Sequence, residues 1–88
     1  MPSIMVTIQN KLGLHARAAA QFVKLTNRYK AEVVVAKQGR QVNGKSIMGV
    51  MMLAASKGSQ LMISADGPDA DEILARLSDL IQNKFGEE

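Results

Sequence analysis

The sequence contains a single histidine, His15, which lies in the segment Gly13-Leu-His-Ala-Arg17 directly before a helix-forming run. At a helix N-terminus, free backbone N–H groups and the positive end of the helix dipole favour a bound phosphoryl group. An imidazole can acquire that group by nucleophilic attack. Arg17 can add a charge-assisted contact to the phosphate oxygens. The alternative is a histidine that only caps the helix or packs, and these residues alone leave both interpretations open.

Ser46 is a second residue with chemical potential. It follows the loop Asn43-Gly44-Lys45 and takes the position of an N-cap before a short helix predicted over Ile47–Leu53. A hydroxyl at that position can be phosphorylated without unfolding the helix, because the helix dipole favours the added negative charge. We therefore predict both a capping role and a regulatory phosphorylation site for Ser46.

The helix after Ser46 is too short for all its apolar residues to face inward. We expect Ile47 and Met48 to be exposed and Val50 and Leu53 to be buried. An exposed patch that contains methionine suits docking to several partners.

Two other function classes have to be weighed. The segment Gly39–Ser46 matches the phosphate-binding loop pattern G-x-x-x-x-G-K-[ST], and Asp66 ends a later strand as a magnesium-binding acid would. However, the chain between Val35 and Val42 has room only for a hairpin, whereas nucleotide sites lie on parallel sheets with long crossovers.

An RNA-binding module is the other alternative. Against it, the spacing of the two phenylalanines is that of core residues, which leaves Tyr29 as the one aromatic available for stacking.

Composition narrows the possibilities further. The 88 residues make one domain, spanning 1–88, and contain no cysteine. With one histidine as well, we expect no metal and no cofactor. The N-terminal residues lack the pattern of a signal peptide and no apolar run is long enough to cross a membrane, so we expect a cytoplasmic protein without membrane contact. Residues 1–65 have a net charge of +8 and residues 66–88 one of −5. The basic part favours an acidic or phosphate-bearing partner.

The elements that must position these residues follow from hydrophobic periodicity. Strands are predicted over Ile4–Ile8, Glu32–Ala36, Gln41–Val42 and Gln60–Ala65, and helices over Ala16–Tyr29, Ile47–Leu53 and from Asp69 to Gly86. Asp69 and Glu72 have the spacing of a capping box for the last helix, whose apolar stripe extends to Phe85. The order β-α-β-β-α-β-α predicts an α+β open-faced two-layer sandwich, with helices on one face of the sheet and water on the other.

Two segments in register, Lys11-Leu-Gly-Leu-His-Ala-Arg-Ala-Ala-Ala20 and Asn43-Gly-Lys-Ser-Ile-Met-Gly-Val50, resemble the HPr family of histidine-containing phosphocarriers. That family belongs to the bacterial phosphoenolpyruvate-dependent phosphotransferase system. The resemblance implies a four-stranded antiparallel sheet with three helices on one face. It also implies that His15 accepts a phosphoryl group on Nδ1 from enzyme I and passes it to EIIA-type domains, with Arg17 stabilising the group. Ser46 corresponds to the serine modified by HPr kinase/phosphorylase where that enzyme exists.

The resemblance further implies a docking surface around His15 and a monomeric carrier that binds no nucleic acid. We assign this surface to Ala16, Lys24, Arg28, Lys45, Ile47, Met48 and Met51. Position 18 is alanine where members that serve sugar transport usually have proline. Alanine should leave the site intact, because proline in a first helical turn removes no needed hydrogen bond. The substitution is similar to HPr-like proteins of a nitrogen-related regulatory branch, so both branches stay open.

Overall fold

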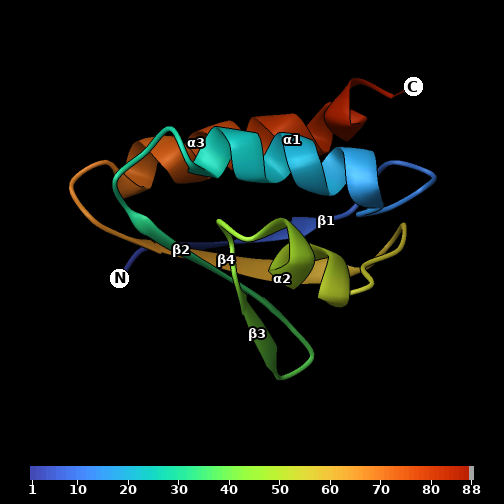
Figure 1. The fold of residues 1–88 in the computed structure, drawn as a ribbon, viewed down its shortest axis with the longest axis horizontal. Coiled ribbons are helices and arrows are strands. Elements are labelled where there is room, and N and C mark those ends of the chain that lie inside the picture. Colours follow the sequence, from blue (N-terminus) through green and yellow to red (C-terminus); the bar gives the residue numbers. More distant parts are fainter. Residues whose placement is uncertain (88) are drawn as a thin grey trace.

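The computed structural model describes residues 1–87. In it, the predicted strands pair into a single antiparallel sheet (Figure 1). The strands are β1 (Ser3–Thr7), β2 (Glu32–Lys37), β3 (Arg40–Asn43) and β4 (Gln60–Asp66), in the spatial order β1-β4-β2-β3. All three pairings are antiparallel. The fold class predicted from the element order is confirmed.

The helices are α1 (Ala16–Thr26), α2 (Ile47–Met52) and α3 (Ala70–Gln82), and a 3-10 segment, η1, spans Lys84–Gly86. Helices α1 and α3 lie side by side over one face of the sheet, and α2 packs against α1 and β3 (Figure 1). None of the described helices is both long enough and apolar enough to cross a membrane.

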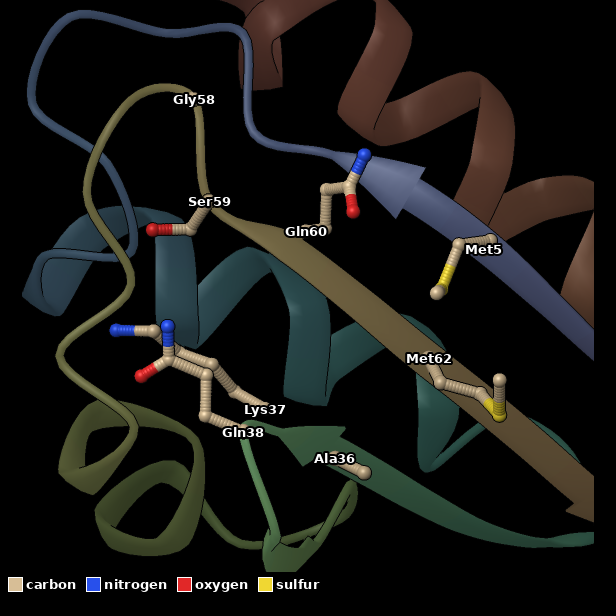
Figure 2. Close-up of a pocket in the computed structure, with 8 residues that line it drawn as sticks. All are labelled: Met5, Ala36, Lys37, Gln38, Gly58, Ser59, Gln60 and Met62. Atoms are coloured by element: carbon tan, nitrogen blue, oxygen red, sulfur yellow. The ribbon is translucent and has the colours of Figure 1, made fainter.

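The core lies between the sheet and its helices. Along β4, Leu61, Ile63 and Ala65 point into it, while Met62 is 43% exposed on the other side. Met5 of β1 lies opposite Met62 in the strand register. Figure 2 shows Met5, Ala36 and Met62 together on the face of the sheet that the helices leave uncovered. The predicted open face is therefore present. Both phenylalanines are buried, also as predicted.

The phosphate-binding-loop alternative is wrong. The residues of that pattern do not wrap around a ligand site, because Arg40–Asn43 form strand β3 and pair in register with Val34–Lys37 of β2. The resulting hairpin turns at Gln38 and Gly39, which both have positive φ. A hairpin of this kind presents no cradle of backbone N–H groups for phosphates.

The first helix is shorter than predicted. It ends at Thr26 and not at Tyr29, because the following amides of Arg28 and Tyr29 donate to carbonyls three residues back. Buried Thr26 also turns its hydroxyl to the chain after β3, where it donates to the carbonyl of Gly44 at 2.8 Å. The last residue of α1 is thus tied to the neighbouring chain at the point where the helix gives way to a turn.

The capping box predicted for the last helix is also wrong. The described structure has no side-chain cap hydrogen bond at Asp69. Its carboxylate accepts instead from the backbone N–H groups of Lys30 and Ala31, at 2.9 and 2.8 Å. Glu72 accepts from the hydroxyl of Tyr29 at 3.0 Å. Both acids therefore tie α3 to the turn between α1 and β2. Phe85 is buried as expected but lies outside α3, in η1 with φ 56°.

Candidate functional site

His15 is the N-cap residue of α1. Its backbone is extended, with φ −75° and ψ −178°, and its carbonyl accepts from the N–H of Ala19 at 2.8 Å. Within residues 1–87 its side chain makes no capping hydrogen bond to the first turn. The ring is therefore available for other chemistry, and 28% of the side chain is exposed.

The helix start supplies donors beside the ring. The N–H groups of Ala16, Arg17 and Ala18 precede the first i to i−4 hydrogen bond of α1, so they have no partner within the helix. The first turn contains no acidic residue that would compete for these donors. Arg17 is exposed and lines the same shallow depression as His15. The arrangement can hold an anionic group on the ring.

The loop before His15 is held in place by glycine geometry. Gly13 has φ +66°, and a Cβ built on it would lie 2.4 Å from the carbonyl oxygen of Ala55. That carbonyl accepts from the N–H of Leu14 at 2.8 Å. Any L side chain at position 13 would have to displace this contact. The approach to His15 is thus fixed against the segment between α2 and β4.

Glu87 comes to the histidine from the far end of the chain. Its Oε2 contacts Nε2 of His15, and its Oε1 accepts from Nδ2 of Asn10 at 2.9 Å. The same Nδ2 donates to the carbonyl of Gly13 at 2.8 Å. Asn10 is fully buried and the Glu87 side chain is only 11% exposed. A carboxylate therefore lies against the ring nitrogen and is anchored to the loop beneath it.

The environment of Glu87 keeps it ionised. The hydrogen bond from Asn10 lowers the pKa of the Glu87 carboxyl below its usual value, and the hydrogen bond and charge of His15 act in the same direction. The charge of Arg17 contributes further, while partial burial opposes the shift. At neutral pH the group facing Nε2 is therefore an acceptor.

The chain reaches this position through an unusual turn. After α3 ends at Gln82, Lys84, Phe85 and Gly86 all have positive φ, between 56° and 74°. Two of these are not glycine, and such residues adopt this conformation only when the surrounding structure holds them there. The buried Phe85 side chain supplies that anchor.

The sequence patterns did not predict that Asn10 and Glu87 belong to the site. Their sequence positions, in a polar connection and in the acidic C-terminal part, carry no periodicity or motif that would pair them with His15. Only the three-dimensional structure brings these side chains together.

The second site has the predicted local structure. Ser46 is the N-cap of α2, and its Oγ accepts from the N–H of Gly49 at 3.1 Å. Ile47 and Met48 are 44% and 72% exposed, and Met51 is 40% exposed. Val50 and Leu53 are buried, so the expected division of this helix is confirmed.

The basic residues assigned to docking differ in their surroundings. Lys24 and Arg28 are exposed on α1 and just after it. Lys45 is half-buried and its ammonium donates to the carbonyl of Tyr29 at 2.8 Å, so it also joins the end of α1 to the Ser46 loop. Among residues 1–87 no cluster of three or more His, Cys, Asp or Glu side chains could hold a metal ion.

Comparisons with known proteins place the chain among proteins of known family and fold. Residues 2–83 match the family described as "PTS HPr component phosphorylation site". The phosphocarrier protein HPr of Cupriavidus necator is 53% identical over 81 residues, which cover 92% of this chain and 91% of that protein. The crystal structure of HPr-C-His from Thermoanaerobacter tengcongensis is 45% identical, with a TM-score of 0.96 over 100% of this chain and 99% of that chain. An HPr dimer from the same organism, also 45% identical, has a TM-score of 0.79 over 99% and 100% of the two chains.

The open-faced sandwich and the matched sequences together define a class of small phosphocarrier proteins. The chain belongs to the HPr family, the phosphocarriers of the phosphotransferase system. Membership implies partners within that system, and neither the nucleotide-binding nor the RNA-binding alternative is supported.

Proposed function

We propose that His15 is the residue that carries the phosphoryl group, bound to Nδ1. The contact between Nε2 and Glu87 supports this assignment most directly. An ionised carboxylate only accepts hydrogen bonds, so the ring nitrogen that faces it is the one that bears hydrogen. In a neutral imidazole the lone pair then lies on Nδ1, which is the nucleophile.

The donor is enzyme I in its phosphorylated form, and the acceptors are EIIA-type domains. The Nδ1 lone pair attacks phosphorus and forms an N–P bond, while the bond between phosphorus and the donor breaks and its electron pair stays on the donor. The amides of Ala16 and Arg17, with the Arg17 guanidinium, hold the phosphoryl oxygens. Stabilisation has to be modest, because a carrier that bound its cargo too tightly would not release it to the next acceptor.

The docking surface consists of Ala16, Lys24, Arg28, Lys45, Ile47, Met48 and Met51. It has an apolar centre on α2 and basic residues on and after α1, and the two helices pack against each other. Such a surface fits a partner with an apolar patch bordered by acidic groups. Met48 is more exposed than Ile47 and Met51, which makes it the first candidate for insertion into a partner.

Ser46 is the regulatory site, modified by HPr kinase/phosphorylase where the organism has that enzyme. Its position at the edge of the docking surface supports this role, since Ile47 and Met48 follow it directly. A phosphate there would add negative charge to a surface whose partners are acidic.

We further propose that the carrier acts as a monomer in the cytoplasm. His15, Arg17 and Glu87 all come from one chain, so the site needs no second copy. Sedimentation equilibrium at the concentrations used for transfer assays should give a mass near 9.5 kDa. A dimer at those concentrations would contradict the monomer proposal but not the proposed role of His15.

The decisive experiment is labelling with ³²P-phosphoenolpyruvate and enzyme I. The wild-type chain should acquire a label that acid removes, as expected for phosphohistidine, whereas phosphoserine would survive. His15→Ala should abolish the label, and Ser46→Ala, the matched control, should retain it. Acid-labile labelling that persists in His15→Ala would show that another residue carries the group.

A further inference from the structure

We propose that Glu87 is a positioning residue of the phosphocarrier, which holds the hydrogen on Nε2 of His15 and thereby keeps the lone pair on Nδ1 throughout phosphoryl transfer. This inference rests on the proposed role of His15. It adds a residue from the far end of the chain to the site, together with Asn10, the residue that orients it.

The orientation of Asn10 is fixed by its partners. Its Nδ2 atom contacts the carbonyl of Gly13 at 2.8 Å and Oε1 of Glu87 at 2.9 Å. Both partners are acceptors, so the atom that faces them has to be the amide nitrogen with its two hydrogens. One hydrogen is used by the loop and the other points at position 87. The Glu87 carboxylate is therefore held by a donor on one oxygen and faces His15 with the other.

The same carboxylate serves both states of the carrier. Before transfer it accepts from the Nε2 hydrogen of the neutral ring. When Nδ1 attacks, the N–P bond forms and the donor's bond to phosphorus breaks, while the Nε2 hydrogen stays in place. The ring then has the phosphoryl group on Nδ1 and hydrogen on Nε2, so it carries positive charge that the carboxylate partly neutralises. Onward transfer breaks the N–P bond and returns the electron pair to Nδ1, and no proton has to move.

A substitution that keeps the shape of residue 87 separates this role from a structural one. In Glu87→Gln the side chain has one acceptor and one donor. Because Asn10 presents a donor, the glutamine oxygen should face Asn10 and the glutamine nitrogen should face Nε2. Nε2 would then have to accept, which moves the ring hydrogen to Nδ1 and blocks the nucleophile. Glu87→Ala removes the carboxylate without imposing either tautomer.

The first measurement is the tautomer of His15 by ¹⁵N NMR of the whole chain. The wild type should have hydrogen on Nε2, and Glu87→Gln should shift the population towards hydrogen on Nδ1. The matched control is Glu32→Gln, which removes the same charge at an exposed position on β2. It should leave the ring as in the wild type. A wild-type ring with hydrogen on Nδ1, or no change of tautomer in Glu87→Gln, would overturn the proposal.

The second measurement is the rate of phosphoryl transfer from enzyme I. We expect kcat to fall by about tenfold in Glu87→Gln, as for the loss of one charge-assisted hydrogen bond, and by less in Glu87→Ala. KM should change little, because the Glu87 side chain is only 11% exposed and offers little surface to a docked partner. A merely structural role predicts that alanine is the worse substitution.

The outcomes keep the two proposals apart. If wild type and both Glu87 variants are labelled at equal rates, the positioning role fails and the role of His15 stands. A faster rate in Glu87→Ala would show that the acid obstructs the ring, and would also overturn the positioning role. If His15→Ala keeps its acid-labile label, the role of His15 fails, whereas the NMR result still reports whether Glu87 sets the tautomer. Thermal unfolding of each variant shows whether the fold is intact.

Discussion

Ser46 caps α2 and is also the proposed regulatory site, and a pair of substitutions should separate the two roles. Its Oγ accepts from the N–H of Gly49 at 3.1 Å and so caps α2. Ser46→Ala removes this cap, which should cost about 1 kcal/mol of unfolding free energy. For a domain of this size the corresponding decrease in Tm is about 4–8 °C. Ser46→Asp should have little effect on Tm, because aspartate is as good an N-cap as serine and its charge suits the helix dipole.

For the affinity for enzyme I, we expect the reverse: Ser46→Asp should weaken binding and Ser46→Ala should not. The alanine variant keeps the charge of the docking surface, so its Kd should stay close to that of the wild type. The aspartate variant places a negative charge beside Ile47 and Met48, where we expect acidic partner groups. Two like charges about 4 Å apart in water repel by about 1 kcal/mol, which corresponds to a Kd increased about fivefold.

Isothermal titration calorimetry and thermal unfolding on the same three proteins test both parts. The alanine variant is the control for destabilisation, since a loss of affinity through a frayed α2 would appear there first. If Ser46→Asp binds enzyme I as tightly as the wild type, a charge at this position does not regulate docking. If Ser46→Ala unfolds at the wild-type temperature, the observed cap contributes nothing to stability.

Two further predictions concern the contacts that hold the site's elements together. Thr26→Val removes the hydroxyl that donates to Gly44 without changing the side-chain shape, so we expect unfolding in urea to show a loss of about 2 kcal/mol. Thr26→Ser keeps the hydroxyl and should lose about 1 kcal/mol, and an equal loss in both variants would contradict a role for the hydrogen bond. The hydrogen bonds from the amides of Lys30 and Ala31 lower the pKa of the Asp69 carboxyl in the folded protein. The contribution of Asp69 to the free energy of unfolding is therefore complete above the pKa that this carboxyl has in the unfolded chain. It disappears as the pH falls through the lower pKa of the folded protein. Unfolding free energies measured between about pH 6 and pH 2 should therefore depend less on pH in Asp69→Asn, and an unchanged slope would count against this linkage.

Local patterns were sufficient for much of the fold. The alternation of apolar and polar residues in β4 and the apolar stripe of α3 identify a half-buried strand and a helix that covers it, since these periods follow from backbone geometry alone. Element ends were less well predicted. Helix α1 ends at Thr26, whose hydroxyl bonds across to Gly44, and Asp69 bonds to the turn before β2 in place of its own helix. Both side chains have partners that are remote in sequence, which no local pattern reveals.

The same division applies to the site. The sequence by itself determined that His15 and Ser46 begin helices, because a polar residue after a glycine-containing loop and before a helix-forming run is a local signal. It also determined that part of the helix predicted over Ile47–Leu53 has to be exposed, because so short a helix cannot bury every side chain. Only the tertiary structure decided which ring nitrogen of His15 faces an acid. Glu87 is 72 residues away in the chain, and no hydrophobic periodicity predicts a contact over that separation. Its position depends on the packing of Phe85 and on the hydrogen bond that the Asn10 amide donates to it. Both contacts exist only in the folded molecule.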